Sequence, residues 1–225
     1  MRLTVIGCSP AWPNPGSAQS GYLVEGSGRL LLDCGPGVLA RLREREAWPR
    51  IDAIAVSHLH LDHVADLVGW LWGAKVGPGR GKPQPVLWLP HGGEDGLKPL
   101  TEELRDAFEV HEYAPREPFE AAGFQLTAFP TRHSALPHGF RITDGQRTLA
   151  FSGDSGPDPV LAEIADGTDL FLCEATQHDD EPADMHLTAA QAVAIGAKRL
   201  LLTHRPAELP PAGAVVAHDG LEVDV

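Results

Sequence analysis

Short apolar runs alternate along the chain with segments rich in polar residues, glycine and proline. Apolar runs of about four to eight residues bounded by turn residues are typical of buried β-strands. This pattern predicts strands at Leu3–Gly7, Gly21–Glu25, Leu30–Asp33, Ile51–Ser57, Val86–Leu89, Phe124–Phe129, Phe140–Thr143, Thr148–Ser152, Leu170–Cys173 and Leu200–Thr203.

A second periodicity indicates helices between these strands. Apolar residues from Val64 to Trp72 recur at i, i+3, i+4, i+7 and i+8, which is the spacing of an amphipathic helix. Further helices are predicted at Val38–Ala47, Thr101–Phe108, Pro159–Ala165 and Ala189–Lys198. Since strands occur both as close neighbours and with helices between them, we expect mixed sheets covered by helices, in a single domain of residues 1–225.

The composition is that of an ordinary folded domain, with 43% hydrophobic and 22% charged residues. The formal net charge of −13 disfavours broad, non-specific contact with DNA or RNA, because a negative surface repels long polyanions. Gly77–Pro85 is the clearest loop candidate, and it carries the basic residues Arg80 and Lys82. No role is predicted for this loop.

Three cysteines, Cys8, Cys34 and Cys173, are far apart in the sequence and form no CxxC pair. An odd, scattered set is typical of buried thiols in a reducing compartment rather than of a disulfide framework. The opening apolar run is too short for the core of a signal peptide, and no stretch approaches the ~18 apolar residues of a membrane span. We therefore expect a cytoplasmic protein that does not contact a membrane.

One segment directly after a predicted strand carries the strongest chemical signal in the chain. It has the pattern HxHxDH, so that His58, His60, Asp62 and His63 fall within six residues. Imidazole and carboxylate groups are the ligands that Zn, Mn and Fe take in proteins. A loop that is histidine-rich by chance rarely combines three histidines and an aspartate in this spacing, so we predict a metal site.

Three more ligand-type residues, His133, Asp154 and His204, each lie just past an apolar strand. Any one of them alone would ordinarily be a structural or solvent-exposed group. Because four adjacent residues cannot easily saturate two metal ions, ligands from other parts of the chain are needed. The shared position of these three residues at strand ends favours one site built with the HxHxDH segment.

This order of motifs resembles the metallo-β-lactamase superfamily, in particular its RNase Z-like and phosphodiesterase branch. The resemblance extends from Gly7 to about Arg205 and includes the segments Leu32–Gly35, Glu174–Thr176 and Met185–Ala189. It implies an α/β (α+β) fold, a four-layer αββα sandwich of two mixed sheets with the site at one edge. Asp33 matches the structural aspartate that lies under the metal loop in this family.

The resemblance also implies a dinuclear site with a bridging water or hydroxide. In that site one metal takes His58, His60 and His133, the other takes Asp62, His63 and His204, and Asp154 bridges them. Two divalent ions are therefore expected. Zinc suits the histidines, and manganese or iron fits the same ligands.

His186 and Glu174 form the predicted proton-transfer pair. His186 precedes a helix that begins with the capping-box residues Thr188 and Gln191, and it is expected to protonate the leaving alkoxide. The resemblance assigns Glu174 to orient and charge His186, since a carboxylate raises the proton affinity of an imidazole. Residue pattern alone leaves an exposed loop histidine equally open. Asp62 is a further catalytic candidate, as a residue that orients the attacking water while binding metal.

The expected activity is hydrolysis of a small anionic phosphodiester, such as a cyclic nucleotide, a cyclic phosphate or a short oligonucleotide. The chain lacks the long arm with which RNase Z enzymes grip tRNA, so large nucleic acids are not expected as partners. Hydrolysis of a carboxylic ester, thioester or lactone is an alternative, because a bridging hydroxide also attacks carbonyl carbons. Two further alternatives are an RNase Z-like ribonuclease and, least favoured, a metal-binding protein without turnover.

Several residues near these motifs carry no assigned role. Ser134, His138 and Arg205 adjoin predicted ligands and either contact substrate or are solvated. His91, His111, His178 and His218 match no motif and are interpreted as structural or surface residues. The tryptophans line either the core or an interface, which leaves a homodimer open; they are Trp12, Trp48, Trp70, Trp72 and Trp88.

Overall fold

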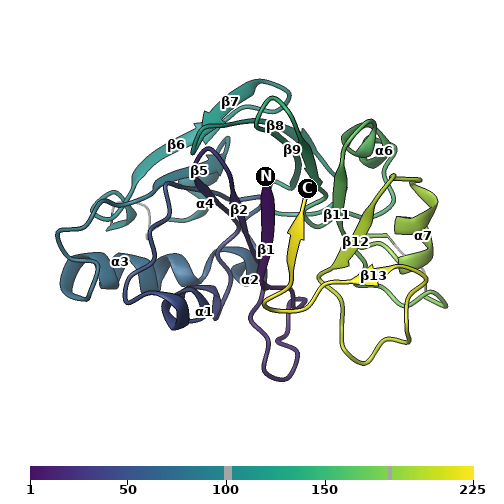
Figure 1. The fold of residues 1–225 in the computed structure, drawn as a ribbon, viewed down its shortest axis with the longest axis horizontal. Helices are drawn as coiled ribbons and strands as arrows, with labels where there is room; N and C mark the ends of the chain where they lie inside the picture. The colour runs from purple at the N-terminus through teal and green to yellow at the C-terminus, as the bar shows by residue number, and fades with distance from the viewer. Residues whose placement is uncertain (99–102, 182–183) are drawn as a thin grey trace.

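The computed structural model describes residues 1–98, 103–181 and 184–225, and two sheets dominate this part of the chain (Figure 1). The first sheet contains, in spatial order, β14 (Glu222–Asp224), β1 (Arg2–Gly7), β2 (Gly21–Glu25), β3 (Arg29–Leu32), β4 (Ala53–Ala55), β5 (Val86–Pro90) and β6 (Glu109–Tyr113). The second contains β13 (Val215–Val216), β12 (Leu200–Thr203), β11 (Leu170–Glu174), β10 (Thr148–Phe151), β9 (His138–Thr143), β8 (Phe124–Pro130) and β7 (Pro118–Ala121).

Both sheets are mixed, as predicted. In the first sheet, β1 to β3 pair antiparallel and β3 to β6 pair parallel. In the second, β7 to β10 pair antiparallel and β10 to β13 pair parallel. Short turns join β2 to β3, β7 to β8 and β9 to β10, whereas most parallel neighbours are joined by longer crossovers that contain the helices.

Helices cover the outer face of each sheet. The helices on the side of the first sheet are α1 (Val38–Arg45), α2 (Leu61–Val64), α3 (Asp66–Val76) and α4 (Gly93–Gly96), and those on the second are α6 (Val160–Ala165) and α7 (Ala189–Ala194). The alternation along β3 shows how the layers form. Leu30 and Leu32 pack into the core between the sheets, whereas Leu31 packs with the residues of α1 and α3. The result is the expected αββα sandwich.

The core between the sheets is rich in aromatic residues that are almost completely buried. Tyr22 from the first sheet lies 5.3 Å from Phe151 of the second, measured between ring centroids. Phe124 and Phe140 join the same cluster. Burial of each such side chain contributes about 1.5–3 kcal/mol, so this layer anchors the two sheets against each other and holds the strand ends that carry the metal ligands.

Four strands were not predicted, namely β6, β7, β13 and β14. All four lie at sheet edges, where polar side chains face solvent and the apolar signal is weak. The predicted helix Ala189–Lys198 ends at Ala194, because Gly196 adopts a φ of 81° that leaves the helix. Part of the predicted helix Thr101–Phe108 lies outside the described residues.

The structure also bears on the predictions made for the cysteines and for membrane spans. Cys8, Cys34 and Cys173 are buried free thiols, as predicted. In the ranges that the structure describes, no helix combines the length and apolarity needed to cross a bilayer.

Candidate metal centre

Strand ends bring the ligand-type residues together at one edge of the sandwich. The HxHxDH segment follows β4 and leads into α2. His133, Asp154 and His204 follow β8, β10 and β12, respectively. These residues are remote in sequence, yet they form two adjacent groups in which all ligand atoms lie within 4.8 Å of one another.

The first group consists of His58, His60 and His133. His60 Nδ1 lies 3.1 Å from His58 Nε2 and 3.2 Å from His133 Nε2. A tetrahedral ion with bonds of about 2.0–2.1 Å to nitrogen separates its ligands by about 3.3–3.4 Å. The three nitrogens therefore converge at nearly the spacing that one metal ion requires.

The second group consists of Asp62, His63, Asp154 and His204, all of which are buried. His63 Nε2 lies 3.4 Å from Asp62 Oδ2, and His204 Nε2 lies 3.1 Å from the same oxygen. His63 Nε2 is fully buried and has no hydrogen-bond partner among the residues that the structure describes. Because buried polar atoms are almost always partnered, this orphaned nitrogen fits a metal ligand.

Asp154 lies between the two groups. Its Oδ1 is 3.5 Å from His63 Nε2, and its Oδ2 is 3.8 Å from His58 Nε2. Burial alone would raise the pKa of this carboxyl, but His204, His63 and His58 hold it well below its ordinary value. The carboxylate therefore presents one ionised oxygen to each group, which is the arrangement of a bridging ligand.

Each ligand histidine donates the N–H of its other ring nitrogen to an acceptor outside the two groups. Such hydrogen bonds leave the inward nitrogen unprotonated and aim its lone pair at the metal position. The contacts are His58 Nδ1 to Ser57 Oγ at 3.1 Å, His60 Nε2 to Ser134 Oγ at 3.1 Å, His63 Nδ1 to Asp33 Oδ2 at 2.7 Å, His133 Nδ1 to the Met185 carbonyl at 2.9 Å and His204 Nδ1 to Thr176 Oγ1 at 2.8 Å.

Two of these residues have unusual backbone conformations. Asp33 and His204 adopt φ values of 59° and 50°, in the left-handed region that residues other than glycine seldom occupy. Asp33 is held there by the Ser57 N–H and hydroxyl, which donate to its carboxylate at 2.7 and 2.9 Å. The Thr176 hydroxyl holds His204 by donating to its carbonyl at 2.7 Å. Strained backbone kept in place by such contacts is common at functional sites.

His186 and Glu174 lie beside the two groups. His186 Nδ1 is 2.9 Å from Glu174 Oε1, and its ring packs 4.8 Å from that of His133, between centroids. Glu174 is buried and accepts hydrogen bonds from the N–H groups of Ser155 and Thr176. Burial lowers the pKa of His186, but the hydrogen bond and charge of Glu174 outweigh it and raise that pKa to about 9 in the metal-free protein. The pair is built to hold a proton next to the metal ligands.

The residues that adjoin the ligands have mainly structural contacts. Ser134 bonds His60, as described above, and Arg205 donates to the carbonyls of Ala175 and Pro210. His138 is buried and donates its Nδ1–H to the Leu136 carbonyl. The sequence pattern did not reveal the roles of Ser57 and Thr176 as partners of ligand rings. Serine and threonine are too common for their position alone to signal such a role.

His178, which was interpreted as a structural or surface residue, lines a cavity of about 430 Å³ beside His186 and His204. Trp12, from the loop after β1, lines the same cavity. Neither residue belongs to a motif, and only the folded chain places them near the metal ligands.

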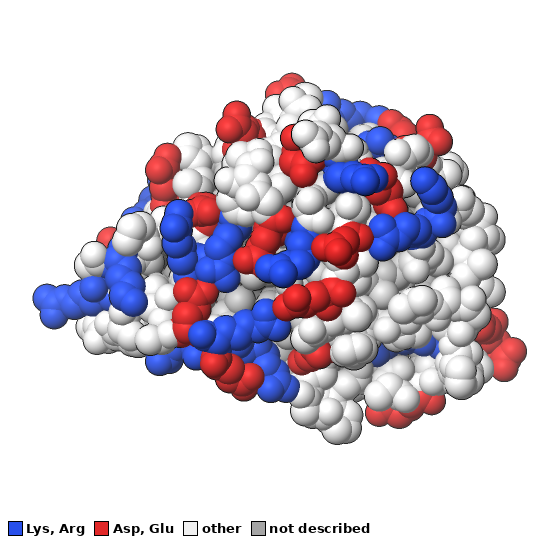
Figure 2. Space-filling view, in the orientation of Figure 1, with Lys and Arg blue, Asp and Glu red and all other residues white. Residues whose placement is uncertain are grey.

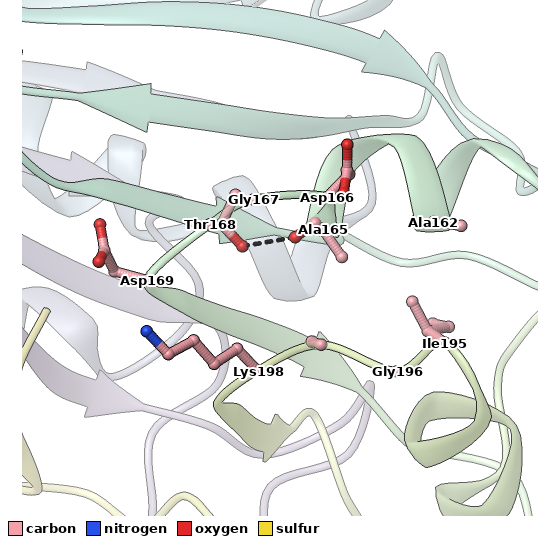
Figure 3. A pocket seen from close by; sticks show the side chains of 10 residues that line it. Ala162, Ala165, Asp166, Gly167, Thr168, Asp169, Ile195, Gly196 and Lys198 are labelled. Carbon is pink, nitrogen blue, oxygen red and sulfur yellow. Dashed lines mark hydrogen bonds between the residues drawn. The ribbon is translucent and has the colours of Figure 1, made fainter.

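A second cavity, of about 650 Å³, lies away from the ligands (Figure 3). Asp169 and Lys198, which line it, come just before β11 and β12, whereas the ligands follow the opposite ends of the parallel strands. Figure 3 shows mainly small side chains around it. It holds no group of histidines and carboxylates and is not part of the metal centre.

Comparison with known proteins agrees with this geometry. Residues 28–205 match the family model described as the β-lactamase superfamily domain. The protein Rv1339 of Mycobacterium tuberculosis is 35% identical over 228 residues, which cover 92% of this chain and 81% of Rv1339. The probable metallo-hydrolase YhfI of Bacillus subtilis is 33% identical over 217 residues, with coverage of 92% and 87%.

The crystal structure of YhfI, described as a metallo-β-lactamase fold protein, matches with a TM-score of 0.87 and 27% identity over 99% of both chains. A ribonuclease Z of Mycobacterium bovis is 26% identical over 242 residues, which cover 91% of this chain and 85% of that protein. The family match spans most of the chain, and its range includes all seven ligand-type residues. The chain therefore belongs to the metallo-β-lactamase superfamily, on its RNase Z-like branch.

Proposed function

We propose that this protein is a metal-dependent phosphodiesterase that acts on a small substrate, such as a cyclic nucleotide, a cyclic phosphate or a short oligonucleotide. The observation that carries the proposal is the pair His186 and Glu174, which lies directly beside the seven ligand-type residues. The names of two relatives, a probable metallo-hydrolase and a ribonuclease Z, support hydrolysis and phosphodiester cleavage, respectively.

The ligand residues supply a site for two divalent ions. When bound, such a pair of ions acidifies a shared water and offsets the charge that develops on a phosphoryl group. The five histidines and two carboxylates fit zinc, and they also fit manganese or iron. Asp62, whose Oδ2 lies beside His63 and His204, would contribute a ligand oxygen and, in this proposal, also orient the attacking water.

His186 supplies the proton that the reaction needs at its end. The water oxygen forms a bond to phosphorus, and the bond from phosphorus to the leaving oxygen breaks. An alkoxide leaving group is strongly basic and takes the Nε2 proton of His186. Glu174 keeps its hydrogen bond to Nδ1, so the ring stays oriented while its charge changes. An alkyl carboxylic ester also releases an alkoxide and would use the same proton, so the ribonuclease Z relative is what favours a phosphodiester over a carbonyl ester.

The surface supports a small substrate. The net charge is −13. On the face shown in Figure 2, Lys and Arg side chains alternate with Asp and Glu and form no continuous basic surface. Some of the basic residues form ion pairs with carboxylates, such as Arg2 with Glu25 and Arg29 with Glu46. A long polyanion would find little attraction on this face.

The test is a panel of substrates assayed on protein loaded with zinc or manganese. Bis-p-nitrophenyl phosphate reports diester cleavage, while p-nitrophenyl acetate and a lactone report carbonyl chemistry. We expect turnover of the diester and at least about 10²-fold less turnover of the other two. Turnover of the ester or lactone with an inert diester would overturn the proposal in favour of a carbonyl hydrolase.

A further inference from the structure

The cavity beside His186 and His204 is lined by both apolar and polar residues. Trp12, Pro206 and Leu209 are among the apolar ones, and Glu181 and Glu208 are among the polar ones. Because His186 itself lines the cavity, the part of a substrate whose oxygen receives its proton lies in or next to this space. The residues that line the cavity therefore indicate the chemistry of the substrate group that is attached to that oxygen.

Trp12 is a large aromatic side chain that is 51% exposed. Its loop is nevertheless fixed to the segment after β12. The Asn14 side chain donates to the Arg205 carbonyl and accepts from the Ala207 N–H, each at 2.9 Å. An exposed indole on a loop that hydrogen bonds hold in place offers a surface on which a planar ring can stack.

Apart from its histidines, the titratable groups of the lining are carboxylates, which disfavour anionic groups. Among the described lining residues there is no Lys or Arg, whereas Glu181 and Glu208 each carry a carboxylate. The Gln177 side chain donates a hydrogen bond to Glu181, which keeps that carboxylate at the wall. Carboxylates accept hydrogen bonds from N–H groups and repel phosphates, so this space favours an uncharged ring that bears amino groups.

We infer that this cavity binds the nucleoside of the substrate, with Trp12 stacked on the base and a carboxylate of Glu181 or Glu208 accepting from an exocyclic amino group. The volume of about 430 Å³ lies within the range of small-molecule sites, about 300–1,000 Å³. The inference rests on the proposed phosphodiesterase function. It restricts the substrate to diesters that carry an amino-bearing base and disfavours diphosphates with a second charged group on this side.

The test compares a cyclic phosphate of adenosine with a cyclic phosphate of glycerol, which has no base. Both are assayed on metal-loaded wild type, Trp12→Ala and Trp12→Phe. Trp72→Ala is the matched control, because Trp72 is 50% exposed on α3 and does not line the cavity. Loss of base stacking is expected to raise KM for the adenosine substrate about 5- to 150-fold in Trp12→Ala. Trp12→Phe is expected to restore most of the loss.

The glycerol substrate is expected to be equally hydrolysed by wild type and Trp12→Ala. Equal KM changes for both substrates, or none, would overturn the nucleoside cavity while leaving the phosphodiesterase intact. If neither substrate is hydrolysed, the proposed function fails, and the binding of adenosine to the metal-loaded protein is then measured by calorimetry. Adenosine binding that weakens in Trp12→Ala but not in Trp72→Ala would support the nucleoside cavity. No binding, or binding that is unchanged in Trp12→Ala, would overturn the nucleoside cavity.

Discussion

Asp33 Oδ2 lies 2.7 Å from Nδ1 of His63, and both side chains are buried. This contact determines which nitrogen of the ring faces the metal centre. The Nδ1–H is donated to Asp33, so the orphaned Nε2 faces Asp62 and Asp154. A residue that binds no metal thereby orients one that does.

Replacing Asp33 with asparagine tests this orientation. Asparagine tolerates the left-handed backbone at this position, so the fold is expected to survive. The neutral amide is a weaker acceptor for the His63 N–H, and we expect the affinity of the second metal to fall by about 10–100-fold. Competition with a chromophoric chelator measures it. Two metals per chain bound with wild-type affinity would show that Asp33 has no such role.

Removal of metal is expected to lower thermal stability. The second ligand group is buried, and ions that bind only the folded chain stabilise it by about 4 kcal/mol at a thousand times Kd. For a chain of this size that corresponds to a decrease of roughly 8–16 °C in Tm after chelation. Calorimetry before and after chelation, with zinc then restored, measures the change. A Tm that does not change on chelation would contradict metal binding at this site.

Protonation of His186 gives a prediction for pH dependence. Its pKa in the metal-free protein is raised to about 9 from an ordinary value of 6.5. Since the folded-state pKa is the higher one, the pair stabilises the fold below about pH 6.5, and this contribution is lost as pH rises towards 9. In Glu174→Gln the main raising carboxylate is gone while burial remains, so we expect the pKa to fall from about 9, with Asp154 and Asp62 still acting to raise it.

NMR titration of the His186 ring in the metal-free protein checks these values. In the metal-loaded enzyme, a general acid is active when protonated, so activity is expected to decline as pH rises. That decline is expected at lower pH in Glu174→Gln. A ring that titrates alike in both proteins would show that Glu174 does not charge His186.

Gly156 controls the position of the backbone just before His186. A Cβ at this position would lie 1.8 Å from the Asp184 carbonyl oxygen, so this backbone must shift in Gly156→Ala. We expect kcat to fall by about 10²-fold, because small displacements of a catalytic group are costly. The shift also moves the Met185 carbonyl that accepts from His133, so metal content is measured in the same samples. Gly213→Ala is the control, since its Cβ meets nothing within 4 Å. Equal kcat in the two variants would exclude this positioning.

Much of this centre could be predicted from the sequence, because its ligands follow apolar strands. HxHxDH is local, and the spacing alone indicates a metal. His133, Asp154 and His204 each come after a strand whose apolar run is easily recognised. Strand ends that meet at one edge of a sandwich bring such residues together, so position along the chain indicated the group, and the family resemblance assigned the ligand roles.

The contacts around the ligands could not be predicted in the same way. Thr176 reaches His204 across two neighbouring parallel strands, and Trp12 reaches the cavity because Asn14 binds the segment after β12. Both depend on how segments remote in sequence meet in the fold. The edge strands β6 and β7 were missed for a related reason, since half-exposed polar strands have little apolar pattern of their own.

The most direct test of the account is the dependence of His186→Ala on the leaving group. Wild type and variant are assayed, metal-loaded, on a diester with an alkyl leaving group and on bis-p-nitrophenyl phosphate, whose weakly basic leaving group needs no proton. His218→Ala is the matched control, because this exposed histidine lies outside the site. The account predicts a loss of about 10²–10⁴-fold in kcat on the alkyl diester, a much smaller loss on the nitrophenyl diester, and full metal content. Equal losses on both diesters would contradict His186 as the proton donor.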